Sequence, residues 1–475
     1  MRKVRGWTGP LVMLTAAVGI ASCDKVLGTD PAIDHGPAAP PSLASANPPQ
    51  AATVGVAFSY DPTKAGTVFK DPAGGGLTYG IALNPALGLG ASAGRITGVP
   101  TAAGVVNATV TAIDMLGRAV SQTFPIAVFS PGLAAPTLPP TLFAYSDAAV
   151  PLPPHFVNGG PGGPVVGTDN MLPTNATTDA GATLGRVLFY DKRLSANDKI
   201  ACASCHVQRL GFSDSARFSL GFNGGRTTRH APGLANARFY GRGRAFWDER
   251  AATLEDQALT PIQNAVEMGL TLNDLVAKLG ATTYYPPLFS AAFGTPDITS
   301  DRAARAIAQF VRSIRSTQSR FDATFPQPPP GPAGVPLTPL EQQGLTLFNG
   351  AAGCQPCHTT NAQVSDNVHN TGLDSVITDV GAGNGRFKSP SLRNVDVRGP
   401  YMHDGRFNSL QQVVAFYDTG VKNNPGLDGR LRNPDGSVKR LNLTQQQRDA
   451  LVAFMRALTD STLLSSAKFS SPFPP

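Results

Sequence analysis

The feature of this sequence that most restricts its fold is a pentapeptide, Cys-x-x-Cys-His, which occurs at Cys202–His206 and again at Cys354–His358. Two thiols and an imidazole at this spacing can hold a porphyrin by one edge and bind its iron. A zinc site made of four thiolates is the alternative, but it does not need a histidine directly after each cysteine pair. We therefore predict two c-type haems, attached through Cys202, Cys205, Cys354 and Cys357, with His206 and His358 as iron ligands.

The one cysteine outside these motifs, Cys23, ends a segment that is typical of export signals. Basic residues near the N-terminus precede an apolar run from Leu11 to Ile20, which is too short to span a bilayer as a helix. Ile20–Cys23 resembles a bacterial lipobox, in which the cysteine becomes the lipid-bearing first residue, although an ordinary cleaved signal is the alternative. Residues 1–23 are therefore expected to direct the protein to the periplasm or cell envelope and to anchor it to a membrane through Cys23.

Charge and composition exclude some classes of protein. The formal net charge of +7 falls to +4 when the three basic residues of the signal, Arg2, Lys3 and Arg5, are subtracted. This is too little to indicate a nucleic-acid partner. With 50 Gly, 42 Pro and 15% charged residues, the chain is expected to be globular and rich in loops.

Three changes of pattern separate the export segment from the first haem motif. Residues 24–48 are rich in Ala, Pro, Ser and Gly and are expected to form a flexible tether. Residues 49–129 contain short alternating runs, clearest at Val106–Ala112 and Phe124–Val128, which predict an antiparallel β-sandwich. A Pro-rich linker is expected over residues 130–175.

Two stretches of the predicted sandwich, Asp71–Tyr79 and Gly94–Thr101, resemble the immunoglobulin-like or cadherin-like modules of bacterial surface proteins. Such modules are mostly spacers or adhesion units. The sandwich contains no cluster of Asp and Glu dense enough to indicate a calcium site. The resemblance therefore implies a spacer.

The remaining sequence is mainly helical by pattern, with capping residues at Thr338 and Thr444 that predict helix starts, and it contains an internal duplication. Gly185–Phe189 before the first haem motif matches Gly344–Phe348 before the second, and Pro-x-Leu-x-Asn follows each motif, at Pro232 and at Pro390. Each haem is therefore expected to have its own helical c-type cytochrome domain, over residues 176–330 and 331–475. Counting equally from the matched Arg250 and Arg406 places Pro261 of the first half opposite Tyr417 of the second.

The order of these motifs resembles bacterial di-haem cytochrome c peroxidases and the related MauG enzymes over roughly residues 175 to 460. The matching stretches are Leu184–Phe189, Cys202–His206, Phe246–Asp248, Pro261–Met268 and Pro390–Asn394. The resemblance implies an oxidoreductase that uses hydrogen peroxide. The first haem would be the peroxidatic one, and the second would receive electrons from an extracytoplasmic donor such as a cytochrome c.

The resemblance also implies the residues of the first haem pocket. Gln257, Pro261 and Glu267 would line its distal side, opposite His206, and Trp247 would lie between the haems, where an indole can assist electron transfer. Cleavage of the peroxide bond needs a group that moves a proton between its oxygens, and the apolar neighbours of Glu267 suit a proton-carrying carboxyl. From the sequence alone, Glu267 is more typical of a surface residue at a helix start, and Gln257 is compatible with a plain helix position. A lone Trp such as Trp247 usually belongs to a core.

Two positions depart from the peroxidase pattern. Many of these peroxidases have a histidine that caps the first iron, but the matching residue here is Phe222, which cannot bind iron. His230 is the alternative cap, although it stands where the peroxidases have a calcium-ligand Asn, which makes an inter-haem calcium doubtful. At the second haem the peroxidases commonly offer a Met, whereas Tyr417 stands here, as in MauG, with Met402 or His403 as alternative ligands.

The leading prediction is thus a di-haem peroxidase that reduces hydrogen peroxide. Phe222 and Tyr417 suggest a second enzymatic function, a MauG-like peroxide-dependent oxidase of a protein or small organic substrate. The non-enzymatic alternative is an electron carrier in which both irons have six ligands.

Overall fold

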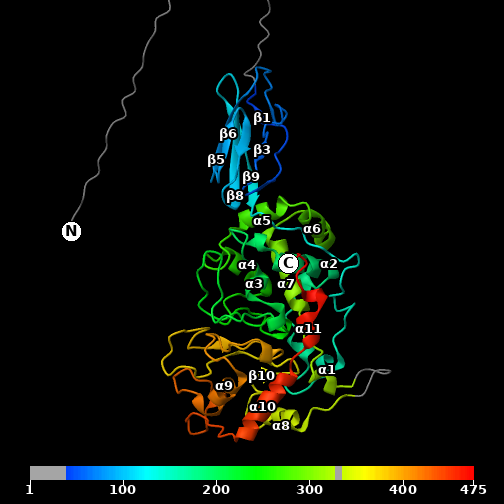
Figure 1. Ribbon diagram of the computed structural model, residues 1–475, viewed down its shortest axis with the longest axis vertical. Helices are drawn as coiled ribbons and strands as arrows, with labels where there is room; N and C mark the ends of the chain where they lie inside the picture. Colours follow the sequence, from blue (N-terminus) through cyan, green and yellow to red (C-terminus); the bar gives the residue numbers. More distant parts are fainter. Residues whose placement is uncertain (1–38, 327–333, 475) are drawn as a thin grey trace, which may run out of the picture.

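The computed structural model describes residues 39–326 and 334–474. The predicted export segment, with Cys23, and most of the predicted tether lie outside the described residues. Figure 1 shows an elongated molecule with a β-rich region at one end and two helical parts that follow along the long axis. Within the described residues, no helix is long and apolar enough to cross a membrane.

The β region, residues 42–129, forms two main sheets. It begins before the predicted start at residue 49, because β1 and Asn47, both within the predicted tether, pair with later residues of this region. Its strands are β1 (Ser42–Leu43), β2 (Gln50–Thr53), β3 (Phe58–Tyr60), β4 (Phe69–Lys70), β5 (Thr78–Asn84), β6 (Leu89–Ser92), β7 (Arg95–Gly98), β8 (Gly104–Ile113) and β9 (Ala119–Phe129). One sheet has the order β2-β9-β8-β5 and the other β3-β7-β6. The predicted alternation is confirmed in β8, where Val106, Ala108 and Val110 bury their side chains in a cluster shared with Ile96 of the second sheet.

One strand pair differs from the antiparallel prediction. β2 pairs in parallel with β9, whereas β5, β8 and β9 pair antiparallel as expected. Alternation of side chains shows which face of a sheet each residue occupies, but it carries no information on strand direction. The sheet is therefore mixed.

The helical remainder is built around two clusters of buried apolar side chains. The first half contains α2 (Asp179–Tyr190), α3 (Cys202–Cys205), α4 (Leu254–Gln263), α5 (Leu272–Gly280), α6 (Tyr285–Phe293) and α7 (Ser300–Ser313). The second contains α8 (Pro339–Asn349), α9 (Leu410–Ala415), α10 (Gln445–Ala457) and α11 (Ser461–Ser465), with short strands β10 (His358–Thr359), β11 (Val364–Ser365), β12 (Val368–His369) and β13 (Phe387–Lys388). The predicted capping boxes at Thr338 and Thr444 open α8 and α10.

The duplicated glycines occupy equivalent places in the two halves. A Cβ atom at Gly185 in α2 would lie 1.9 Å from the carbonyl oxygen of Ala306 in α7. A Cβ atom at Gly344 in α8 would lie 1.9 Å from the carbonyl oxygen of Ala450 in α10. Each half therefore packs its helix pair closely through a position where only glycine fits.

The segment predicted as a Pro-rich linker covers the helical parts as a strap, residues 131–170. Tyr145 is buried and donates its hydroxyl to the carbonyl of Lys468 at 2.7 Å. Phe156 of α1 (Pro154–Val157) and Val165 are fully buried in a cluster with residues of both halves. The Pro-rich composition predicts an extended backbone but does not reveal these widely spaced buried side chains. The segment is therefore more firmly packed than a linker is expected to be.

The C-terminal segment returns to the first half. Leu463 and Phe469 belong to the cluster that contains α2 and α7, and the Gln208 side chain donates to the carbonyls of Leu463 and Ser466, both at 2.9 Å. The division into residues 176–330 and 331–475 stays a prediction, and this segment crosses it.

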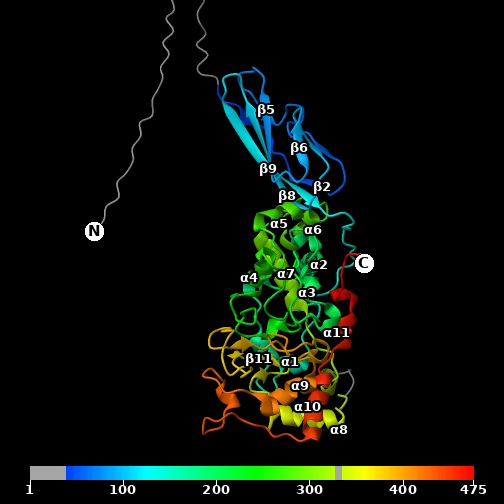
Figure 2. The same cartoon turned by 60° about the vertical axis from the view of Figure 1, so that its left-hand side comes forward.

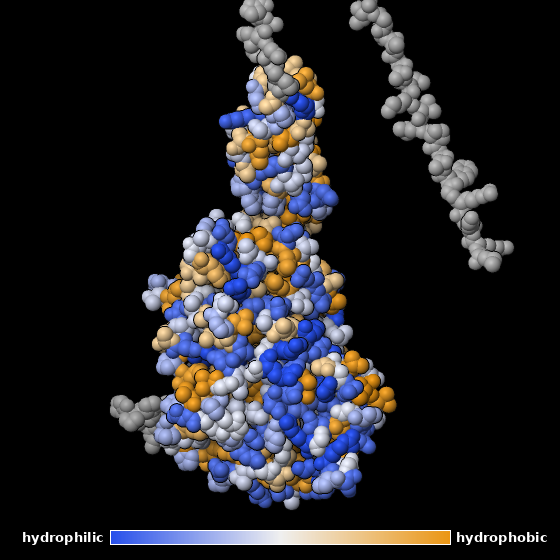
Figure 3. Space-filling model, turned by 180° about the vertical axis from the view of Figure 1, so that it is seen from behind, coloured by the Kyte–Doolittle hydropathy of each residue, from blue (hydrophilic) through white to orange (hydrophobic). Residues whose placement is uncertain are grey.

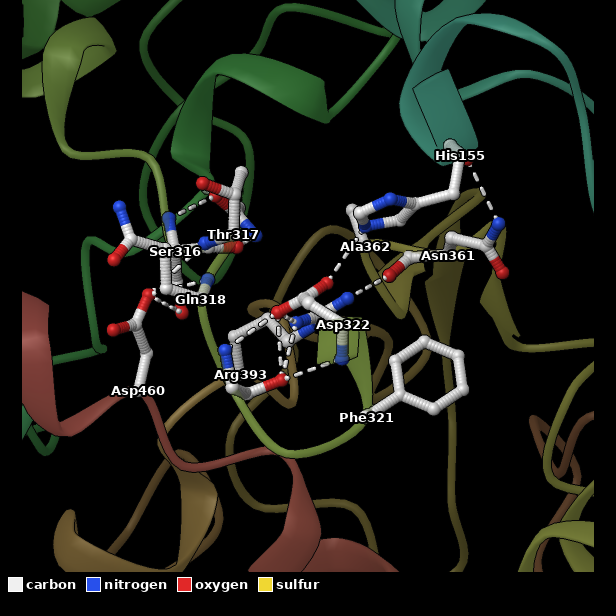
Figure 4. A network of polar contacts seen from close by, with 12 residues as sticks. His155, Ser316, Thr317, Gln318, Phe321, Asp322, Asn361, Ala362, Arg393 and Asp460 are labelled. Atoms are coloured by element: carbon white, nitrogen blue, oxygen red, sulfur yellow. Dashed lines mark hydrogen bonds and ion pairs between the residues drawn. The ribbon is translucent and has the colours of Figure 1, made fainter. Parts of the chain in front are cut away.

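A buried polar network lies where the two halves meet (Figure 4). The Asp322 carboxylate is within 2.5 Å of the Arg393 guanidinium and 2.8 Å of His155 Nε2, and all three side chains are almost fully buried. Burial alone would raise the pKa of Asp322, but Arg393 outweighs it and holds that pKa well below its ordinary value. The Asp460 carboxylate accepts further hydrogen bonds from the backbone N–H groups of Thr317 and Gln318.

Candidate active site

The first haem motif places its histidine for metal binding. Cys202 and Cys205 begin and end the single turn of α3, and His206 follows directly. His206 Nδ1 is 2.9 Å from the carbonyl oxygen of Phe212, which orients the ring and makes Nε2 the nitrogen that would bind iron. Burial lowers the pKa of His206, so the neutral imidazole that binds metals is favoured.

The second motif repeats the burial of the histidine but not its hydrogen bond, because His358 Nδ1 is buried without a hydrogen-bond partner among the described residues. Burial, with the nearby His369, lowers the pKa of His358 to about 4, so this imidazole is neutral as well. The duplicated Phe189 and Phe348 stand at similar distances from the two histidine rings, 6.5 Å and 6.3 Å between ring centroids. Cys354 and Cys357 are partly buried and free, as attachment requires.

A cavity of about 430 Å³ opens beside the first motif. Its lining includes Cys205 and His206 from the attachment motif and the predicted pocket residues Trp247, Gln257, Pro261 and Glu267. The volume is in the range of cofactor pockets, and one wall carries an attachment cysteine and the metal-binding histidine. The residues present therefore fit a haem held by one edge.

Glu267 is held on the turn that follows α4. Asn264 ends that helix, and its side-chain oxygen accepts from the N–H groups of Val266 at 2.8 Å and Glu267 at 3.2 Å. Burial raises the pKa of Glu267, and the nearby Arg250 opposes this only in part. Gln257 and Pro261 lie on α4 itself, so one helix and its terminal turn position all three predicted distal residues.

Phe222 and His230 are both occupied with the protein's own groups. The Phe222 N–H donates to the carbonyl of Glu267 at 3.0 Å, and its ring packs so closely on Gly269 that a Cβ atom there would lie 2.4 Å from it. His230 lines the cavity and is buried, but its Nδ1 is 3.1 Å from the Ala216 carbonyl and its Nε2 is 3.1 Å from the Ser213 hydroxyl. The His230 ring is thus engaged at both nitrogens.

Trp247 lies where the two halves meet. Its indole Nε1–H donates to the carbonyl of His230 at 2.7 Å, and its ring is 6.4 Å from that of His403 in the second half. The His403 ring stacks on Phe387 at 3.6 Å. The sequence analysis considered His403 only as an iron ligand and did not predict this stack. Its place near the matched Arg406 was the one available signal.

Arg229 is a second residue that joins the halves and was not predicted. Its guanidinium pairs with Asp248 at 2.6 Å and with Asp379 of the second half at 2.8 Å. No local motif marks such a residue, because its partners come from distant segments.

The candidate ligands of the second iron, Tyr417 and Met402, belong to one partly buried cluster. Tyr417 lies on a wide helical turn, Phe416–Gly420, that continues α9, and such turns are frequent at functional sites. Burial raises the pKa of Tyr417 well above its ordinary value when no metal is bound. Both residues thus remain candidate ligands of the second iron. Tyr417 is favoured, because it corresponds to Pro261, which lines the first cavity.

Replacing Tyr417 by Met is expected to raise the reduction potential of the second haem, because a thioether ligand raises the potential whereas tyrosinate favours higher oxidation states. A spectroelectrochemical titration of both haems measures this, with Met402→Leu as the control that should leave the potential unchanged. A shifted potential in Met402→Leu and an unchanged one in Tyr417→Met would assign the ligand to Met402.

Comparison with known proteins places these features in context. A family model described as "Di-haem cytochrome c peroxidase" matches residues 179–327, and one described as "Putative Ig domain" matches residues 40–129. The methylamine utilization protein MauG of Methylorubrum extorquens is 34% identical over 296 residues, which cover 60% of this chain and 79% of that protein. The cytochrome c551 peroxidase of Nitrosomonas europaea is 31% identical over 267 residues, covering 53% and 78%.

A solved structure shows the same similarity in three dimensions. The structure of a MauG-like protein associated with microbial copper homeostasis is 32% identical to this chain and superposes with a TM-score of 0.56. The match covers 64% of this chain and 96% of that one.

Proposed function

The chain belongs to the family of di-haem cytochrome c peroxidases and MauG proteins, and from this premise we propose that it reduces hydrogen peroxide with electrons from a small extracytoplasmic redox protein. It is an oxidoreductase of the cytochrome c peroxidase type, and its family implies two c-type haems. This assignment excludes an electron carrier without enzymatic activity.

The observation that carries the proposal is the shared cavity of His206, Gln257, Pro261 and Glu267. A haem held there by Cys202, Cys205 and His206 would supply an iron that reacts with peroxide. Glu267 then takes the proton from the near oxygen of peroxide and returns it to the far oxygen, while the Gln257 amide offers a hydrogen bond. Pro261 carries no ligand atom, so it would not compete with peroxide for an iron held by His206.

Trp247 supports the transfer of electrons between the halves. Its hydrogen bond to His230 and its contact with His403 place an indole between the first cavity and the second half. We propose that Trp247 assists this transfer, and that the donor delivers electrons to the second half.

The alternative is a MauG-like oxidase that uses peroxide to oxidise a protein or organic substrate. Tyr417 and Phe222 favour it, because the peroxidases commonly have a Met in place of Tyr417 and a capping His in place of Phe222.

A steady-state assay separates the two functions. Peroxide consumption by the full-length protein is expected to rise several-fold over background with reduced small cytochromes c, both acidic and basic, and to remain near background with organic reductants. Rapid consumption with organic reductants alone would contradict the peroxidase and support the oxidase.

For the parts of the chain outside the haem halves, we propose an anchored arrangement. Residues 1–23 form a lipoprotein signal, the stretch from residue 24 to the start of the β region a tether, and the β region a spacer that holds the enzyme away from the membrane. Cys23 lies outside the described residues, so this proposal depends on the lipobox pattern.

Cys23→Ser is expected to release the protein from membranes into the soluble periplasmic fraction, because acyl chains supply the membrane affinity. Immunoblots of separated membrane and soluble fractions measure this, and the rate of peroxide consumption should not change. Full retention of the variant in the membrane fraction would show that lipid on Cys23 is not the anchor.

A further inference from the structure

The β region meets the first helical half through a buried polar junction. Ser130, which follows β9, donates its N–H to one oxygen of Asp198 at 2.7 Å. The other Asp198 oxygen is 2.5 Å from the ammonium group of Lys278 in α5, and the side chains of this pair are fully buried. Figure 2 shows β8 and β9 running directly toward α5, and Figure 3 shows that the β region joins the broader helical part over a narrow neck.

Further contacts orient the β region relative to the first helical half. The Phe129 ring at the end of β9 lies 5.6 Å from the Arg193 guanidinium and 6.0 Å from the Lys278 ammonium. Arg193 also donates to the carbonyl of Leu133 at 2.7 Å. The Ser130 hydrogen bond and the packing of Phe129 on Arg193 and Lys278 thus dock the β region on the first half, which leaves no free hinge between them.

The segment Ser195–Asp198, here called the junction loop, has a second side that contacts the backbone next to Glu267, which lines the first cavity. The Asn197 side chain donates to the carbonyl of Phe222 at 2.7 Å, and the Ala196 N–H donates to the carbonyl of Met268 at 2.8 Å. Phe222 in turn donates to the carbonyl of Glu267. Asn197 therefore contacts both sides, because its own carbonyl accepts from the Ser130 hydroxyl at 3.2 Å.

We propose that the junction loop is a positioning element through which the docked β region holds the backbone of Glu267 in place, with Asn197 as the residue that joins the two. This inference rests on the proposed function only in the role of Glu267 as proton carrier. The β region then contributes to the active site, in addition to its role as a spacer.

Hydrogen exchange of the full-length protein with its haems tests the positioning. Asn197→Asp keeps the size and the acceptor of the side chain but cannot donate to Phe222. It is expected to speed exchange in residues 219–225 and 264–269 about fivefold, the effect of one ordinary hydrogen bond. The matched control is Asn223→Asp, which adds the same charge to the exposed tip of the Phe222 loop and should leave exchange in residues 264–269 unchanged.

Phe129→Ala tests the contribution of the β region, since it changes no side chain of the helical halves. It is expected to speed exchange in the same two segments and to slow the reaction with peroxide about fivefold. Wild-type exchange in these segments in both Asn197→Asp and Phe129→Ala would overturn the inference. Faster exchange with an unchanged peroxide rate supports the positioning and counts against the role of Glu267.

Discussion

Glu267→Gln is expected to slow the reaction of the protein with hydrogen peroxide by about a hundred- to ten-thousand-fold, the usual loss when a group that transfers protons is removed. The amide is nearly the same size as the carboxyl, but it cannot take the proton from the near oxygen and return it to the far one. Stopped-flow absorbance after mixing with peroxide measures the rate constant. The spectrum before mixing should hardly change, because Glu267 is not an iron ligand.

Glu341→Gln is the matched control for this experiment. Glu341 caps α8 in the second half, and a glutamine serves equally well in a capping box. The control should react at the wild-type rate. A wild-type rate in Glu267→Gln as well would contradict the proton-carrier role.

The pH dependence of the rate constant for the peroxide reaction is an independent test of the role of Glu267. Because the group must first accept a proton, its reactive form is the carboxylate, so the rate constant should fall as pH decreases through its pKa. Burial raises that pKa above the ordinary value, so the fall should begin at a higher pH than for an exposed Glu. In Glu267→Gln this step of the profile should disappear.

The sequence predicts most reliably those features that depend on spacing within one segment. The capping residues of α8 and α10 and the alternation of β8 were predicted because local backbone geometry sets them. The glycine match between Gly185 and Gly344 was also visible, because close packing of two helices excludes every other side chain at those positions.

Features made by distant segments were not predictable in this way. The docking of Ser130 on Asp198 and the packing of the strap through Phe156 depend on single residues whose partners lie far along the chain. The stack of His403 on Phe387 beside Trp247 is of the same kind. In the sequence these residues look like ordinary loop residues, because only folding brings them next to their partners.

His230 shows how this difference affects the mechanism. From the sequence it was an alternative cap for the first iron, because it stands near the position of the missing histidine. Its ring is held instead by the Ala216 carbonyl and the Ser213 hydroxyl, and its own backbone binds both His403 and Trp247. Moving the ring onto the iron would break these contacts together, which favours an uncapped site.

The fully oxidised protein is therefore expected to react with peroxide without prior reduction. In a capped peroxidase the oxidised enzyme is almost inert, because a loop must first release the iron; with Phe222 in place of the cap, no such step is needed. The oxidised protein should show one high-spin or water-ligated haem by electron paramagnetic resonance, and reduction of the second haem should not speed the peroxide reaction. His230→Gly should leave the spin state unchanged. An entirely low-spin protein that stays inert until reduced, and that His230→Gly opens, would show that His230 caps the iron, while the peroxidase function would still stand.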